Sequence, residues 1–211
     1  MKKVSKGAYG YLARRRKTET IKTILYFLIP LALFAAGILT TGTRRNLLTI
    51  VAVLGILPAS KNAVLLIMYL KSHGISAADH TIITSTINKD ETGVKDALIL
   101  LEDMVFTTRE VTYEVPAIIL YGGSMLGYLS PQQQKKVKEQ QAAGKGDMQK
   151  LLQDLEKHLE TTMKKENLSV NAKIYEGIEP FTKRILEIKP LEHADRSKSE
   201  AAARVLADIS L

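Results

Sequence analysis

Two long apolar stretches dominate the first third of the chain. Residues 24–39 carry no charge, and flanking threonines extend this stretch to residues 20–41. That length gives about 33 Å of helix, enough to cross a hydrocarbon core about 30 Å thick. A second apolar stretch covers residues 47–70 after a short turn at 42–45. Because spans joined by so short a turn must be antiparallel neighbours, the pattern predicts a transmembrane helical hairpin over residues 20–71.

The second stretch contains a polar interruption between Pro58 and Asn62. Lys61 lies about 13 Å of helical rise before Leu70, which approaches the middle of a bilayer. A lysine there costs roughly 2.5–3.5 kcal/mol. Lys61 and Asn62 are therefore candidate intramembrane polar residues, for a partner helix or a small conduit. The other interpretation, which we favour, is a bend at Pro58 that lets Lys61 snorkel to the headgroups.

The pattern changes to shorter elements after residue 75. The predicted order is helix, three strands, helix, strand, helix, at residues 76–87, 97–107, 111–121, 125–129, 147–163, 170–175 and 178–188. This order predicts an α+β domain over residues 76–190, in which helices cover one face of an antiparallel β-meander. Residues 132–146 are expected to form an exposed helix or insert. Residues 191–211 are expected to form a charged tail with a weak helix at 201–209.

Charge is divided unevenly along the chain. The net charge is +8, and all of the excess lies in the first 71 residues. The rest is mildly acidic, which does not favour nucleic-acid binding. Eight basic residues precede the charge-free residues 24–39, and only Arg44 and Arg45 lie between the spans. The positive-inside rule therefore predicts a plasma-membrane protein with a cytoplasmic basic tail at residues 1–19 and a cytoplasmic C-terminal domain.

The basic residues just before the first span also suggest a lipid partner. Arg14, Arg15, Arg16 and Lys17 suit the anionic headgroups of a lipid bilayer, at about 1 kcal/mol for each basic residue near the surface. A cleaved signal peptide is the alternative interpretation of this end of the chain. The second apolar stretch argues against it.

Few residues suggest catalysis. The absence of cysteine excludes disulfides, thiolate zinc sites, iron–sulfur clusters and cysteine nucleophiles. Glu102, Asp103 and Glu114 are the weak catalytic candidates. Glu102 and Asp103 are adjacent in a predicted strand, so their side chains should point to opposite faces.

Histidines and glycines form no recognisable site. No two of His73, His80, His158 and His193 have zinc spacing with further ligands. Ser124 suits a turn better than a nucleophile elbow, and the glycines at 144 and 146 do not form a phosphate loop. The sequence therefore predicts neither a metal site nor a cofactor.

The chain resembles two groups of known proteins, and each resemblance implies something about its structure or function. The element order is that of the restriction-endonuclease-like core, which implies an acid on the second strand and an acid-x-Lys pair on the third. The third strand, 125–129, has neither. The chain also resembles uncharacterised two-span bacterial membrane proteins, on the segments 9–11, 14–16, 40–43, 54–59, 106–108 and 173–175. That resemblance implies location and architecture, and no activity.

Two functional hypotheses follow. The first is a membrane-anchored, non-catalytic interaction or adaptor module at the cytoplasmic face, with a protein partner or a second copy of itself. The alternative is a membrane-tethered, metal-dependent hydrolase or nuclease-like enzyme with a degenerate restriction-endonuclease-like core, which would use Glu102, Asp103 or Glu114.

Overall fold

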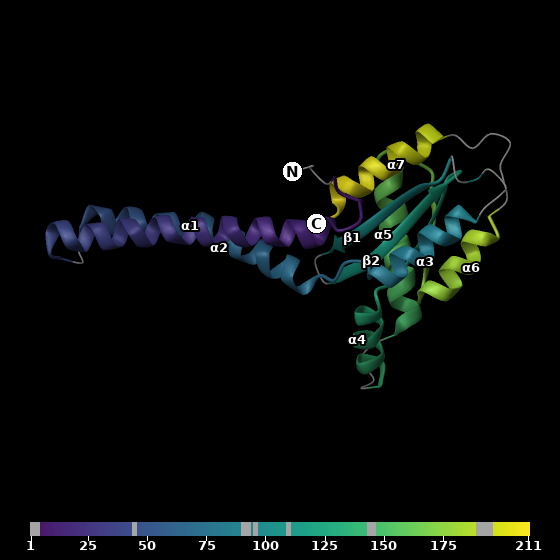
Figure 1. Ribbon diagram of the computed structural model, residues 1–211, viewed down its shortest axis with the longest axis horizontal. Coiled ribbons are helices and arrows are strands. Elements are labelled where there is room, and N and C mark those ends of the chain that lie inside the picture. The colour runs from purple at the N-terminus through teal and green to yellow at the C-terminus, as the bar shows by residue number, and fades with distance from the viewer. Residues whose placement is uncertain are drawn as a thin grey trace. The chain divides into compact units, whose positions relative to one another are not determined.

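The computed structural model describes residues 5–43, 46–89, 94, 97–108, 111–142, 147–188 and 196–211. The chain forms two compact units (Figure 1). One consists of Leu12–Ser72, and the other combines Met1–Tyr11 with His73–Leu211. Below, the first is the hairpin unit and the second is the α+β unit.

The hairpin unit is built from α1 (Tyr11–Thr41) and α2 (Leu47–Lys71). Both helices are long and apolar enough to cross a membrane, and only 17% and 11% of the residues in their most apolar windows are buried. A core helix of a soluble protein would be mostly covered, so these apolar surfaces need an environment that the described residues do not supply. α1 begins before residue 20, where the first span was predicted, and α2 continues through Pro58. Arg44 and Arg45 lie outside the described residues.

Small residues let the two helices approach closely. A Cβ added at Gly55 would lie 3.1 Å from Pro30 Cγ, and one at Gly37 would lie 3.1 Å from Leu48 Cβ. Pro30 and Gly37 are seven residues apart on α1, as Leu48 and Gly55 are on α2. A seven-residue seam with small residues is typical of closely packed antiparallel helices in membranes.

The α+β unit contains a four-stranded sheet in the order β1-β2-β3-β4. Its strands are β1 (Ile99–Thr107), β2 (Thr112–Tyr121), β3 (Ser124–Tyr128) and β4 (Asn171–Tyr175). The first three strands are antiparallel, and β4 pairs parallel with β3. The α+β class is confirmed. The sheet is mixed, because α4 (Pro131–Ala142) and α5 (Met148–Lys165) carry the chain back across it before β4.

Helices cover both faces of the sheet, so the prediction of helices on one face is wrong. α3 (Ala77–Asn88) and α6 (Ile178–Leu186) contribute Ile83 and Phe181 to one core cluster. α5 and α7 (Arg196–Ile209) contribute Leu155 and Leu206 to the other. β2 is buried from Tyr113 to its end, as expected of a strand covered on both sides.

Residues 191–211 were predicted to be a charged tail. In the structure, residues 196–209 form α7, and its Ala202 and Leu206 are buried in the core. Residues 191–195 lie outside the described part of the chain. α7 follows the edge of the unit in Figure 1, and the chain then pairs with β1 through Leu211 N, which donates to Val105 O at 2.9 Å.

Both edges of the sheet are covered by hydrogen bonds. On β1, Glu102 N donates to Gly7 O at 2.8 Å. On β4, Ile174 N donates to Glu156 Oε1 at 2.8 Å, and Ala172 N donates to Glu160 Oε1 at 3.1 Å. These contacts occupy backbone groups that an open edge would offer to another strand.

Candidate functional site

Glu102 and Asp103 both bind the segment of residues 73–80, contrary to the expectation that they face opposite sides. The cause is the backbone of Asp103, which has φ 57°, in the left-handed region. Aspartate tolerates this region better than most residues. The alternation of β1 shifts here, since Leu101 and Met104, three positions apart, lie in the same core cluster. Two adjacent carboxylates therefore reach the same part of the α+β unit.

Glu102 is paired with His80 at the first turn of α3. Its Oε1 lies 2.6 Å from His80 Nδ1, and Glu102 is only 4% exposed. The imidazole stacks on the ring of Tyr9, with centroids 4.0 Å apart. Together with the backbone bond to Gly7, these contacts fasten residues 5–11 and the start of α3 to β1.

Asp103 fastens the chain just before α3. Its Oδ1 accepts a hydrogen bond from Ile75 N at 2.8 Å, and both residues are buried. Gly74 packs directly on this carboxylate: a Cβ at Gly74 would overlap Asp103 Oδ1 and lie 3.1 Å from its Cγ. Any side chain at position 74 would therefore displace the carboxylate.

Glu114 on β2 is the third buried carboxylate. Its Oε2 accepts a hydrogen bond from Ser130 Oγ at 3.0 Å and lies 3.7 Å from His73 Nδ1. Its backbone N donates to Gln133 Oε1 at 2.6 Å. Glu114 thus holds the first turn of α4 on the sheet and is close to the residue that opens the segment after α2.

Each of the three carboxylates therefore holds another segment of the α+β unit against the sheet. We call residues 5–11 and 73–76 the junction segments, because the chain passes from one compact unit to the other beside each of them. Glu102 and Asp103 hold both junction segments on β1, and each buried carboxylate has a partner from another element. Among the described residues, no group of three histidine, aspartate or glutamate side chains could hold a metal ion.

Tyr128 and Asp79 form a further polar pair, which sequence reasoning missed. Tyr128 Oη donates to Asp79 Oδ2 at 3.1 Å. Burial, the negative charge of Asp79 and this hydrogen bond raise the pKa of Tyr128 well above its ordinary value, with a smaller effect from Glu102. The hydroxyl therefore stays protonated and acts as a donor. The only hint in the sequence was that Asp79 follows the capping residue Ser76 by three positions.

A groove of about 410 Å³ opens beside this pair. It lies where the parallel strands β3 and β4 end, between the first residues of α4 and α6. Its lining includes three acidic side chains, Asp79, Glu176 and Glu179, and apolar surface from Pro131 and Ile178. The crevice at the carboxyl ends of parallel strands is where open α/β sheets bind their ligands.

The remaining residues that the sequence singled out do not form a site together. His158 is partly exposed on α5, and Ser124 begins β3 after a two-glycine turn with φ 54° and 83°. His193 and residues 143–146 lie outside the described residues.

Lys61 and Asn62 lie on α2 where it faces Thr23 of α1. Thr23 Oγ1 donates to Asn62 O at 3.5 Å, whereas Lys61 is exposed and has no hydrogen bond or ion pair within the described chain. Thr23 borders the charge-free residues 24–39. Lys61 therefore lies beside the end of that stretch. This position favours snorkelling over an intramembrane contact.

The four basic residues of α1 have different environments. Arg16 donates to Tyr69 O at 3.2 Å and to Ser72 O at 2.8 Å, so it caps the last turn of α2. Arg15 pairs with the buried Glu19 at 3.1 Å. Arg14 and Lys17 have exposed side chains. Arg15 and Arg16 thus make contacts within the hairpin unit.

Comparison with known proteins supplies no relative. No family model, no curated protein and no solved structure matches this chain.

Proposed function

We propose that this protein is a two-pass membrane protein that holds a non-catalytic interaction module at the cytoplasmic face of the plasma membrane. The hairpin unit supports the membrane part of the proposal, because its apolar helices expose Ile24, Leu31 and Leu57. The distribution of lysine and arginine supports the orientation. Arg14 and Lys17 have exposed side chains, and we expect them to face anionic headgroups.

One observation carries the choice of a binding module over an enzyme. The buried carboxylates Glu102, Asp103 and Glu114 are engaged by His80, the backbone of Ile75 and Ser130. A general base or metal ligand must be accessible to substrate or ion, and these three residues are only 4–6% exposed. Each of these carboxylates instead makes a contact that holds elements of the α+β unit together.

The groove beside Tyr128 is the surface on which we expect a partner to bind. Asp79, Glu176 and Glu179 give it a negative lining, and Pro131, Ile178 and Pro180 give it apolar contact area. Glu176 is already paired with Lys138 at 2.7 Å, which indicates how a basic side chain is accepted there. The partner is therefore a protein segment with basic side chains. α4 of a second copy, which exposes Lys135 and Lys136, meets the same description.

The test is site-specific photo-cross-linking in native membranes. A photoreactive residue at Ile178, in the groove, should give a discrete adduct, whereas one at Gln153, exposed on α5, should not. Glu179→Lys should abolish the Ile178 adduct, and Asp154→Lys, a matched reversal on α5, should leave it unchanged. The mass of the adduct distinguishes a different protein from a second copy. Adducts at both positions, or an Ile178 adduct indifferent to Glu179→Lys, would contradict the proposal.

A second candidate function rests on the positions of two of the same carboxylates. Glu102 and Asp103 reach the same segment of the chain, and His80 lies 2.6 Å from Glu102. The closeness of these side chains supports the alternative proposal, a metal-dependent hydrolase or nuclease-like enzyme. Manganese titration of the full chain by calorimetry tests it: binding that is lost in both Glu102→Gln and Asp103→Asn supports the enzyme, and the absence of binding rules against it.

A further inference from the structure

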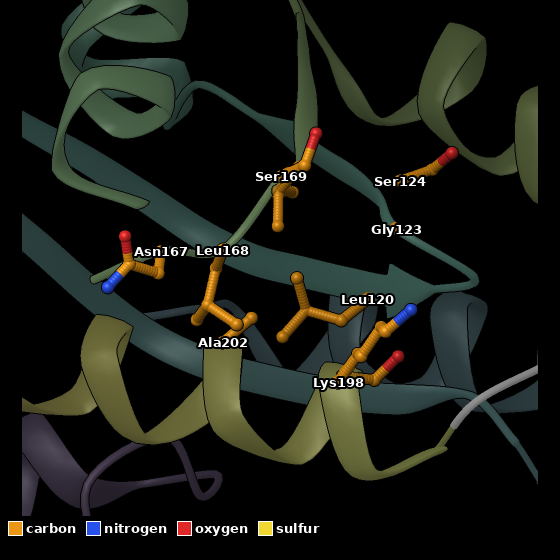
Figure 2. Close-up of a pocket in the computed structure, with 10 residues that line it drawn as sticks. Leu120, Gly123, Ser124, Asn167, Leu168, Ser169, Lys198 and Ala202 are labelled. Carbon is orange, nitrogen blue, oxygen red and sulfur yellow. The ribbon is translucent and has the colours of Figure 1, made fainter. Parts of the chain in front are cut away.

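A separate cavity of about 220 Å³ lies on the face of the sheet that α5 and α7 cover. Figure 2 shows its walls: the end of the β2–β3 hairpin with Gly123 and Ser124, the loop with Ser169 that leads into β4, and α7 with Lys198. Leu120, Leu168 and Ala202 form an apolar base. The volume is smaller than the roughly 300–1,000 Å³ of pockets for drug-sized ligands. The cavity therefore suits a small ligand.

The lining of the cavity contains a hydroxyl without a partner. Ser199, in the first turn of α7, lines the cavity and is 4% exposed, and its Oγ has no hydrogen-bond partner among the residues that the structure describes. Most buried polar side chains have a hydrogen-bond partner, and a buried group without one lowers stability. An unpaired buried hydroxyl beside a cavity is a position that a bound ligand would satisfy.

The charge around the cavity selects for an anion. Lys198 lies next to Ser199, and in Figure 2 its amine extends from α7 toward the hairpin side near Leu120. The first turn of the 14-residue α7 adds the positive end of the helix dipole. Among the described residues that line the cavity, none is acidic, and Ser124, Ser169 and Asn167 add polar groups.

We infer that this cavity binds a small free oxyanion of the phosphate type, with Lys198 supplying charge and Ser199 Oγ donating a hydrogen bond. Phosphate combines the charge that a lysine at a helix N-terminus favours with acceptors for the hydroxyl. The site draws on no residue of the acidic groove. Its failure or success is therefore independent of the proposed interaction module.

The test is thermal unfolding and calorimetry of the full chain in detergent, with inorganic phosphate at constant ionic strength. Phosphate should raise the unfolding midpoint of the wild type. Lys198→Gln should weaken phosphate binding by about tenfold, the usual order for loss of a bond to a charged group. Lys157→Gln, an exposed lysine on α5, should leave the affinity unchanged.

Ser199→Ala separates a ligand-binding hydroxyl from a packing residue. It should raise the midpoint in the absence of phosphate, because an unpaired buried hydroxyl is removed. It should also shrink the increment that phosphate produces. The inference is overturned if phosphate has no effect on the wild type, or if its effect is equal in the wild type, Lys198→Gln and Ser199→Ala. An equal effect of acetate would overturn the assignment to phosphate.

Discussion

Replacing Gly74 with alanine should loosen the attachment of the segment before α3. Gly74 does not adopt a left-handed backbone conformation, so alanine meets no backbone strain there. Its Cβ would instead overlap Asp103 Oδ1, which accepts the hydrogen bond from Ile75 N at 2.8 Å. Because Ile75 and Asp103 are both buried, the carboxylate must rotate away and lose that bond.

The size of the effect follows from the groups involved. A hydrogen bond to a charged group contributes about 1.5–3 kcal/mol. Alanine returns about 0.4–1 kcal/mol by restricting the unfolded chain. The net destabilisation is therefore about 1–2 kcal/mol, which lowers the unfolding midpoint of a domain of this size by roughly 3–6 °C.

A double-mutant cycle measures whether the loss passes through Asp103. Urea unfolding of the full chain in detergent, followed by the near-UV circular dichroism of tyrosine, gives the free energy of unfolding for Gly74→Ala, Asp103→Ala and the double variant. With the carboxylate gone, only the effect on the unfolded chain remains, so Gly74→Ala should stabilise by about 0.4–1 kcal/mol and the coupling should reach about 1.5–3 kcal/mol. Additivity within about 0.5 kcal/mol, as for independent sites, would refute the reasoning.

Three further predictions concern other parts of the chain. Leu206→Ala should lower the free energy of unfolding of the α+β unit by about 2–5 kcal/mol in urea, because it opens a cavity under α7. Arg204 is exposed on the same helix, so Arg204→Ala is the control and should have little effect. Arg16→Gln should lower the resistance of the hairpin unit to detergent unfolding by about 1 kcal/mol, since two carbonyls at the end of α2 lose their donor; Lys17→Gln is the matched control. The pKa of Tyr128 is raised in the folded state. The protonated Tyr128 hydroxyl therefore contributes its full stability below pH 10.0, the ordinary pKa of tyrosine, and this contribution is lost as the pH rises above that value. The free energy of unfolding should fall less steeply with rising pH in Tyr128→Phe than in the wild type.

The sequence predicted the elements with strong periodicity clearly, whereas it predicted only a weak helix at residues 201–209, where the structure has α7. In α5, Leu155 and Leu159 recur at the helical spacing and are buried as expected. Of the buried residues of α7, Ser199 and Ala202 are small and only Leu206 is large and apolar. The buried face of this helix is therefore hard to recognise in a sequence that also contains many charged residues. The parallel pairing of β4 depends on the path of the chain through α4 and α5, which no local pattern records.

The candidate site was predictable in its residue types and not in its geometry. Glu102, Asp103 and Glu114 were singled out as carboxylates in strands. That Glu102 and Asp103 both bind the segment 73–80 depends on the left-handed backbone of Asp103, which strand periodicity does not reveal. The stacking of Tyr9 on His80 joins residues far apart in the sequence. No sequence motif includes both residues, so the contact was not predicted.

The central claim is a two-pass hairpin with the α+β unit on the cytoplasmic side, and cysteine labelling tests it most directly. The chain contains no cysteine, so Thr43→Cys, between the helices, and Gln153→Cys, exposed on α5, each create one reactive thiol. In intact cells, a membrane-impermeant maleimide should label Thr43→Cys and should label Gln153→Cys only after lysis. Labelling of Gln153→Cys in intact cells, or of Thr43→Cys only after lysis, would contradict the claim.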